Sequence, residues 1–246
     1  VRLVRNLKEY PFPGRLTKEQ SAELSEKLLG GLTGIASMDR MQYRFTHLER
    51  MGDLEKTALL ERRAINRSVI KKKDPTGMIL SEDESTAILL NGDDHVRIQT
   101  LQTGLTLEQL YERADKIDDY ISERFDYAFD EKYGYLTSFP TNVGTGLRAA
   151  VVLHLPMLSK NKNFNSLVAD MGRFGTQVRG VYGEGAENFG SLYQISNQKT
   201  LGQTEREIID IVRKAAQELD AQERRVRREY RQRKPVQAAD ECYKSY

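Results

Sequence analysis

The chain has 246 residues, enough to bury a substantial core within one large domain or two small ones. Its formal net charge of +2 gives little support to nucleic-acid binding. No apolar run approaches the roughly 20 residues of a membrane-spanning helix. The single cysteine, Cys242, has no internal disulfide partner, which favours a reducing compartment, and three dispersed histidines argue against a zinc site. We therefore expect a cytoplasmic globular protein.

The first third of the chain is predicted to be mainly helical. Thr17 and Gln20 match a capping box, so a helix should run through the twenties and end at the glycines of residues 30–34. Residues 37–73 have a charged and largely helical pattern, followed by a turn at residues 74–77. The predicted buried face of this second helical region consists of Leu54, Ala58, Leu59 and Ile65.

Short strands dominate the middle of the chain. We expect them at residues 78–80, 86–90 and 96–101, the last with alternating apolar side chains. A second capping box, Thr106 with Gln109, should open an amphipathic helix. The apolar stripe of this helix comprises Leu107, Leu110, Tyr111, Ala114, Ile117, Ile121 and Phe125.

The last part of the chain mixes strands with two helices. The predicted elements are a strand at 134–137, a buried strand at 149–155, a helix near 163–174, strands at 177–182 and 191–196, and a helix from 204 to 234. Short strands separated mostly by turns favour an α+β fold, with a mostly antiparallel β-sheet flanked by α-helices.

The positive charge is concentrated near the end of the chain. Residues 224–234 carry seven basic side chains and one acidic one, a local charge of +6, so the rest of the chain carries −4 of the total of +2. We interpret this segment as a solvated helix face rather than as a nucleic-acid-binding site.

Four segments combine glycine, arginine and carboxylate side chains at predicted strand ends: residues 1–5, 91–97, 139–148 and 179–187. None matches a Walker A loop, a Rossmann fingerprint or the glycine loop of a protein kinase. Each also has a local explanation. Asn91-Gly92 is typical of a hairpin turn with solvated aspartates after it, the Gly-x-Gly pairs are typical of turns, and single arginines are usually solvated.

The order and spacing of these motifs resemble the guanidino kinases, or phosphagen kinases, which include creatine and arginine kinases. The matching motifs are Asn-x-x-Asp-His-x-Arg at 91–97, Pro-Thr-Asn-x-Gly-Thr-Gly-Leu-Arg-Ala at 140–149, Arg-Gly-x-x-Gly-Glu-Gly at 179–185, Ile-Ser-Asn-Gln at 195–198 and Leu-Gly-x-Thr-Glu at 201–205. Within the family, the chain is most similar to the bacterial protein-arginine kinases, through residues 1–13, 154–156, 182–185 and 193–198. The resemblance covers essentially the whole chain and is loosest over residues 14–75.

The resemblance implies a domain organisation. Residues 1–238 are expected to form a guanidino-kinase catalytic domain, with the fold shared by glutamine synthetase, truncated at its N-terminus because the chain begins with Val1. Residues 239–246 would begin a further C-terminal domain. Kinases for small guanidino compounds have a helical domain before the catalytic domain, and this chain has no room for one.

The implied reaction is transfer of the γ-phosphoryl group of ATP, bound with Mg²⁺, to an arginine side chain of a protein. Arginines bind phosphate oxygens through planar forks, and carboxylates hold a guanidinium and accept its proton. The family's nucleotide-binding arginines correspond to Arg2, Arg97, Arg148 and Arg179, with a fifth expected before Val1. Backbone amides of residues 144–146 and 183–185 are expected to add donors.

The family's catalytic carboxylates correspond to Asp93 and Glu184, and Asp94 is expected to contact the hydrated Mg²⁺ through water. Three positions depart from the family pattern: Asp93 replaces a glutamate, Gly92 replaces a second glutamate, and Phe139 replaces a cysteine. The shorter Asp93 would place its oxygens about 1 Å further back, a displacement that can cost on the order of 100-fold in rate. Two hypotheses follow: a weak or retuned kinase, or a pseudokinase that binds nucleotide and serves as a regulatory or scaffold subunit.

The resemblance also implies partners. Those expected are proteins with exposed arginines, an activator protein and a Clp-type protease, as in protein quality control, together with a homodimeric or hetero-oligomeric state. No membrane partner is expected. The basic segment at 224–234 is a candidate autophosphorylation target.

Overall fold

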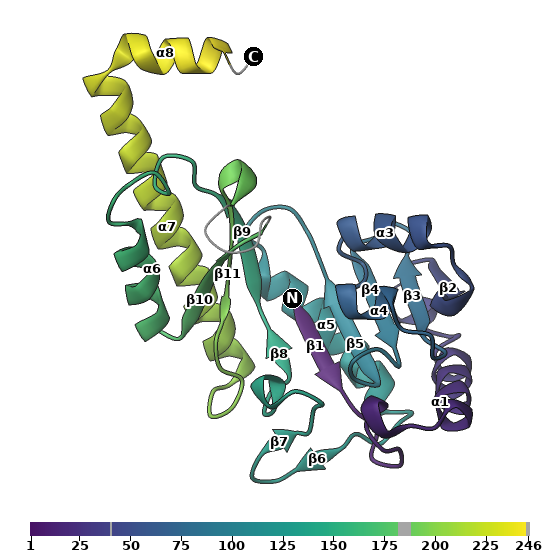
Figure 1. The fold of residues 1–246 in the computed structure, drawn as a ribbon. Helices are drawn as coiled ribbons and strands as arrows, with labels where there is room; N and C mark the ends of the chain where they lie inside the picture. Colours follow the sequence, from purple (N-terminus) through teal and green to yellow (C-terminus); the bar gives the residue numbers. More distant parts are fainter. Residues whose placement is uncertain (40, 182–187, 245–246) are drawn as a thin grey trace. The chain divides into compact units, whose positions relative to one another are not determined.

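The computed structural model describes residues 1–39, 41–181 and 188–244 (Figure 1). The chain divides into two compact units. The first comprises Val1–Arg148 with Lys199–Glu205, and the second comprises Ala149–Gln198 with Arg206–Tyr246. Every strand pair in the described part of the chain is antiparallel, which confirms the predicted α+β class.

The first unit is built on a six-stranded sheet in the order β2-β3-β4-β5-β1-β8 (Figure 1). Its strands are β1 (Arg2–Arg5), β2 (Tyr43–His47), β3 (Gly77–Ser81), β4 (Thr86–Leu90), β5 (Val96–Thr100) and β8 (Leu147–Arg148). The strands β6 (Phe129–Asp130) and β7 (Gly134–Tyr135) form a separate small hairpin. The N-terminal strand β1 therefore lies between β5 and β8, with a partner on each edge.

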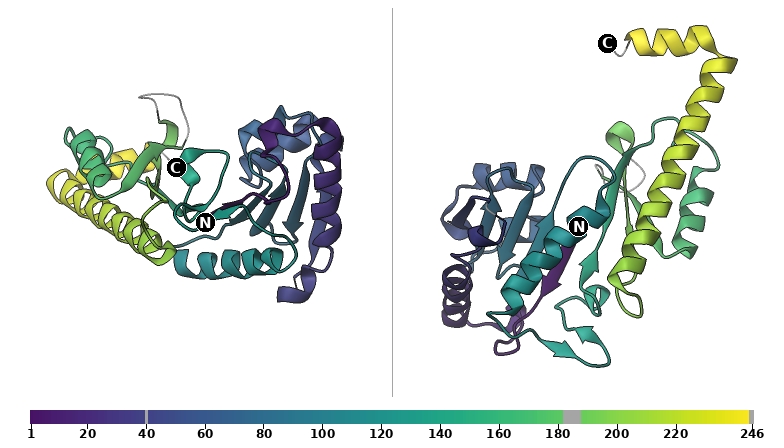
Figure 2. Two further views of the ribbon diagram at one scale, coloured as in Figure 1. Left: turned by 90° about the horizontal axis from the view of Figure 1, so that it is seen from below. Right: turned by 180° about the vertical axis from the view of Figure 1, so that it is seen from behind.

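One face of this sheet is apolar and covered by two helices, α1 (Lys18–Gly31) and α5 (Leu107–Ser122). Figure 2 shows α5 running along β5 and β1. A single cross-strand row of buried side chains underlies the helices, formed by Ile79, Ile88, Ile98, Leu3 and Leu147. The predicted stripe of α5 is buried there, except that Tyr111 is only partly buried.

On the opposite face of the sheet, short helices cover β3 and β4. The covering elements are the helices α3 (Asp53–Glu61) and α4 (Arg67–Ile70) and the 3₁₀ turn η2 (Leu48–Arg50). Their apolar cluster consists of Leu48, Leu59, Ala64, Ile65, Val69, Met78, Leu80, Ala87 and Leu89. Two short helices complete this part of the unit, η1 (Pro13–Arg15) and α2 (Ala36–Asp39).

The largely helical prediction for residues 37–73 is wrong in part. Residues 43–47 form β2, an edge strand paired with β3, because pairing with an existing sheet outweighs a helical charge pattern. Leu54 is 84% exposed while Lys56 is buried, so the buried side of α3 is rotated from the predicted one. Leu59 and Ile65 are buried as predicted.

The two predicted capping boxes have different outcomes. At the start of α1, Gln20 N donates to Thr17 Oγ1 over 3.2 Å and Thr17 N donates to Gln20 Oε1 over 3.0 Å, as predicted. At the start of α5, Thr106 makes no side-chain capping bond, and its hydroxyl oxygen is buried without a hydrogen-bond partner. The helix nevertheless begins at Leu107, because its apolar stripe is buried against the sheet.

The second unit contains a three-stranded sheet in the order β10-β11-β9. Its elements are β9 (Ala150–His154), α6 (Phe164–Arg173), β10 (Thr176–Gly180), η4 (Phe189–Ser191), β11 (Leu192–Asn197), α7 (Glu205–Arg233, whose first residue belongs to the first unit) and α8 (Pro235–Lys244). The core consists of Leu155, Leu158, Phe164, Met171, Ile195, Ala215 and Leu219. Strand β9, predicted to be buried, is only partly so because it lies at the edge of its sheet.

The basic segment forms the exposed second half of α7, as predicted. Within this helix, buried Glu223 accepts hydrogen bonds from the amides of Met157 and Leu158 and pairs with Arg227 over 2.5 Å. The domain boundary predicted after residue 238 falls inside α8. None of the helices in the described ranges is long and apolar enough to cross a bilayer.

Candidate active site

Three arginines project from the open face of the six-stranded sheet. Arg2 in β1 lies directly opposite Arg148 in β8, and Arg97 in β5 lies opposite Val4, two residues along β1 from Arg2. Paired residues, and residues two apart on one strand, point to the same side of a sheet. Arg2, Arg97 and Arg148 therefore share the face of the sheet opposite helices α1 and α5.

The fold holds these three positive charges close together. Burial, followed by the charges of Arg97 and Arg148, lowers the pKa of Arg2 to about 9, while Asp94 and Asp93 act in the opposite direction. Burial also lowers the pKa of Arg97. Arg2 Nη2 donates to Asn142 Oδ1 over 3.3 Å, but its Nε is buried and has no hydrogen-bond partner among the residues that the structure describes. Clustered guanidinium groups with an unused buried donor are suited to an anion with several oxygens, such as a polyphosphate.

Asp94 is a buried carboxylate, 2% exposed, which excludes the interpretation of a solvated turn residue. Its Oδ1 accepts hydrogen bonds from Asn6 Nδ2 and from the amide of Ser138, each over 2.7 Å. Asn6 in turn accepts a hydrogen bond from the amide of His95 over 2.9 Å. These contacts join three segments: the loop after β4, the end of β1 and the segment after β7. All three meet at Asp94, close to the arginines.

The other aspartate of the loop, Asp93, is only partly buried. Its Oδ2 accepts a hydrogen bond from Asn66 Nδ2 over 2.6 Å. The predicted hairpin turn exists, since Asn91 has a φ of 55° and its amide donates to the carbonyl of His95 over 2.7 Å. The Asn91 side chain is buried and donates to Ser21 Oγ, so this turn is anchored in the fold.

His95, also in this loop, is wholly buried as a neutral ring. Its Nδ1 accepts from the amide of Leu7 over 2.9 Å, so the proton is on Nε2, which lies 3.0 Å from the carbonyl oxygen of Pro11. Burial lowers the pKa of His95 to about 4. The ring therefore contributes stability at neutral pH that acid should remove.

We expect this contribution in the pH dependence of unfolding. Between the ordinary histidine pKa of about 6.5 and the lowered pKa of His95 in the folded protein, only the unfolded chain takes up the proton. The free energy of unfolding should therefore decrease by up to about 3 kcal/mol as the pH is lowered through this range. Urea denaturation at about pH 7 and pH 4.5 measures this loss. The variant His95→Gln should be less stable at neutral pH but lose less on acidification. An equal acid-induced loss in both proteins would contradict the assignment.

The Gly-Thr-Gly loop packs against its neighbours rather than presenting all its amides. Gly144, with a φ of 111°, leaves no room for a Cβ atom beside the carbonyl of Thr200. The Gly144 amide donates to Tyr135 O over 3.3 Å, and the Thr145 amide donates to Thr200 O over 3.0 Å. The expectation that these two amides bind phosphate is therefore wrong. Their bonds hold the loop that leads into Arg148.

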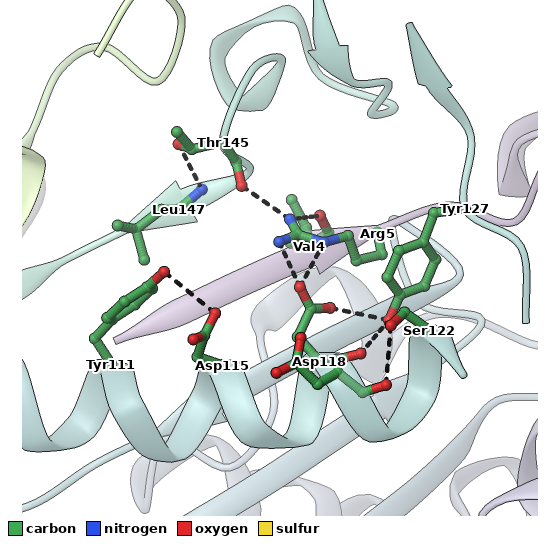
Figure 3. A network of polar contacts seen from close by, with 10 residues as sticks. Val4, Arg5, Tyr111, Asp115, Asp118, Ser122, Tyr127, Thr145 and Leu147 are labelled. Atoms are coloured by element: carbon green, nitrogen blue, oxygen red, sulfur yellow. Dashed lines mark hydrogen bonds and ion pairs between the residues drawn. The ribbon is translucent and has the colours of Figure 1, made fainter. Parts of the chain in front are cut away.

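A buried ion pair fixes β1 from the opposite side of the sheet (Figure 3). Arg5 is 3% exposed, and its Nη2 and Nε lie 2.6 and 3.0 Å from Asp118 Oδ2 in α5. Its Nη1 donates to the carbonyl oxygens of Val4 and Thr145, each over 2.9 Å, and Tyr127 donates its hydroxyl to Asp118 Oδ1. The network thereby links β1, α5 and the Gly-Thr-Gly loop.

Sequence reasoning assigned no role to Arg5 or Asp118. A signal was present, because Asp118 lies four residues after Ala114 and three before Ile121 and so falls on the buried stripe of α5. An acidic residue on a buried stripe requires a partner, and Arg5 is the buried cation of the neighbouring strand.

The remaining predicted site residues belong to other segments of the chain. Arg179 is an exposed residue of β10, opposite Gln194 in the second unit. Glu184 and the glycine-rich loop at 183–185 lie outside the described residues. Phe139 is 51% exposed and follows Ser138, whose amide binds Asp94. Residues 140–142 after it form η3 (Pro140–Asn142), which supplies the partner of Arg2.

Comparison with known proteins identifies the family of the chain. Residues 26–226 match the family described as ATP:guanido phosphotransferase, C-terminal catalytic domain. The whole chain is 39% identical to the protein-arginine kinase of Caldanaerobacter subterraneus subsp. tengcongensis, and 41% identical to that of Halalkalibacterium halodurans. It spans 73% and 69% of these two proteins, respectively.

Solved structures share the fold of this chain. A lombricine kinase superposes with a TM-score of 0.79 at 24% identity, over 91% of this chain and 64% of that one. The duplicated taurocyamine kinase of Schistosoma mansoni, with bound components of a transition-state analogue, gives a TM-score of 0.77 at 26% identity, over 89% of this chain and 31% of that one. The chain belongs to the ATP:guanido phosphotransferase family, whose catalytic domain it contains.

Proposed function

We propose that the protein transfers the γ-phosphoryl group of ATP to a guanidinium nitrogen of arginine residues in proteins. The observation that carries this proposal is the cluster of Arg2, Arg97 and Arg148 on one sheet face beside two aspartates. Full-length similarity to protein-arginine kinases supports the choice of acceptor. The arginines of this arrangement would suit a nucleoside triphosphate, and the aspartates would suit a positively charged acceptor.

The arginines bind and orient the triphosphate. Their planar forks bind phosphate oxygens in pairs, and the Nε of Arg2 supplies a donor that no group in the described part of the chain uses. An anion among the three guanidinium groups also relieves their mutual repulsion. Arg179 from the second unit is proposed to join them on the nucleotide.

Mg²⁺, when bound with ATP, would neutralise charge on the transferring phosphoryl group. Among the described residues, no three His, Cys, Asp or Glu side chains are grouped as a metal site. Asp94 Oδ1 already accepts two hydrogen bonds. This donor set fits an ion held mainly by phosphate oxygens, with Asp94 contacting it through water.

Asp93 is proposed to orient the acceptor guanidinium and to accept its proton. The freed nitrogen lone pair attacks the γ-phosphorus, a nitrogen–phosphorus bond forms, and the bond to the leaving ADP oxygen breaks. The proton passes to the Asp93 carboxylate and from there to solvent. Glu184 is proposed as the second carboxylate on the guanidinium. The three positions that depart from the family pattern keep a second candidate open, a nucleotide-binding pseudokinase that regulates or supports an active kinase.

The protein is expected to incorporate the γ-phosphate of ATP into casein in an acid-labile form, with little transfer to free L-arginine. Radiolabelled ATP with each acceptor measures this directly. Preferred labelling of free arginine would instead indicate a kinase for small guanidino compounds. Binding of ATP and ADP by calorimetry, without label in either acceptor, would support the pseudokinase. A cytoplasmic location, an activator protein and a Clp-type protease remain proposals about its setting.

A further inference from the structure

Asn66 is placed as a helix cap but is not used as one. It precedes the first residue of α4, where an asparagine side chain ordinarily accepts a hydrogen bond from a backbone amide of the first turn. Here no such bond is made. The side-chain Nδ2 instead donates to Asp93 Oδ2 over 2.6 Å and to Ser68 Oγ over 2.7 Å, while the buried Oδ1 has no hydrogen-bond partner within the described ranges. The Asn66 side chain thus contacts Asp93 and does not cap helix α4.

The same segment holds the backbone on which Asp93 lies. Lys72 Nζ donates to the carbonyl oxygens of Asn91 and Gly92 over 2.6 and 2.8 Å. Asn66 directly precedes α4 and Lys72 follows it by two residues, so one short segment contacts the loop at its backbone and at its carboxylate. A loop held at both places has little freedom to turn the Asp93 side chain.

We infer that Asn66 is a positioning residue that fixes the Asp93 carboxylate for the acceptor guanidinium. The hydrogen bond occupies Oδ2 and sets the rotation of the carboxylate, so proton acceptance falls to Oδ1. The Asp93 side chain is short, so the position of its two oxygens depends on the backbone and on the rotation of the carboxylate. Contacts that fix both are therefore needed to direct the carboxylate at the substrate. This inference rests on the proposed role of Asp93 in phosphoryl transfer.

Steady-state kinetics with ATP and casein test the inference. Asn66→Ala should lower kcat by up to roughly 100-fold and leave the KM for ATP unchanged, because the arginine cluster is untouched. Asn66→Asp has the same shape but cannot donate, and it should lose activity at least as strongly. Ser68→Ala removes the other partner of the same amide and serves as the matched control, with kcat unchanged.

A double-mutant cycle separates this inference from the proposed function. Asp93→Asn should abolish most activity, and adding Asn66→Ala to that variant should then change kcat no further. If Asp93→Asn is inactive but Asn66→Ala matches wild type, the positioning role is overturned and the proposed function stands. If Asp93→Asn is as active as wild type, the role of Asp93 fails and the inference fails with it.

The contact itself has a readout that does not require turnover. The side-chain amide protons of Asn66, observed by NMR in the full chain, should shift when Asp93 is replaced by alanine. Unchanged resonances would overturn the inference whatever the activity of the protein.

Discussion

Replacing Asp118 by alanine should lower the free energy of unfolding by about 3–5 kcal/mol, because it leaves the Arg5 guanidinium buried without its counter-charge. In the native protein, Arg5 shares two hydrogen bonds with Asp118 and lies with its guanidinium carbon 3.5 Å from the centre of the Tyr135 ring. Neither group can be rehydrated without opening the contact between β1 and α5. Urea denaturation with tryptophan-independent detection, such as circular dichroism, measures the change.

The adjacent residue provides the control for this substitution. Asp119 lies on the same turn of α5 but is exposed, so Asp119→Ala should change stability by no more than about 0.5 kcal/mol. Equal effects of the two substitutions would contradict the view that the buried pair holds β1 in place.

The second large effect is expected at the arginine cluster. Arg2→Met should lower kcat/KM for ATP by about 10²–10³-fold, the range observed when one donor to a transition-state anion is removed. The stability of this variant should not fall, because the substitution removes both a buried charge and its repulsion from Arg97 and Arg148; burial first, and then this repulsion, lowers the pKa of Arg2. Kinetics and thermal unfolding, measured on one preparation, should therefore show a large loss of activity without a loss of stability.

An exposed arginine of the same sheet is the matched control for charge. Arg44 in β2 is remote from the cluster in strand order, and Arg44→Met should leave the affinity for ATP unchanged. If Arg2→Met retained wild-type affinity and turnover, the sheet face described here would not be the nucleotide site.

The sequence predicted elements well where one physical signal decided the local structure. In α5 and in β5, apolar residues repeat at the spacing that places them on one buried face of the helix or strand. Both predictions were confirmed. The family resemblance assigned Arg2, Arg97 and Arg148 to the nucleotide, and the structure places them on one sheet face, although they lie on three different strands. Their binding role stays a prediction. Local pattern alone would have treated each of them as a solvated surface residue.

Other features depended on contacts between distant parts of the chain. Strand β2 exists because β3 offers an edge, and nothing within residues 43–47 outweighed the helical charge pattern around them. The Thr145 amide donates to the carbonyl of Thr200, which lies more than fifty residues along the chain, and the Gly144 amide donates to the carbonyl of Tyr135. The hydrogen bond from Asn66 to Asp93 spans 27 residues and has no local signal, since an asparagine before a short helix normally indicates a cap.

The most direct test of the account is mass spectrometry of casein after incubation with the protein, ATP and Mg²⁺. We expect phosphoarginine in the wild-type reaction, strongly reduced phosphoarginine with Arg2→Met and with Asp93→Asn, and an unchanged yield with Arg44→Met. A wild-type reaction without phosphoarginine, from protein that binds ATP, would contradict the assignment as a protein-arginine kinase.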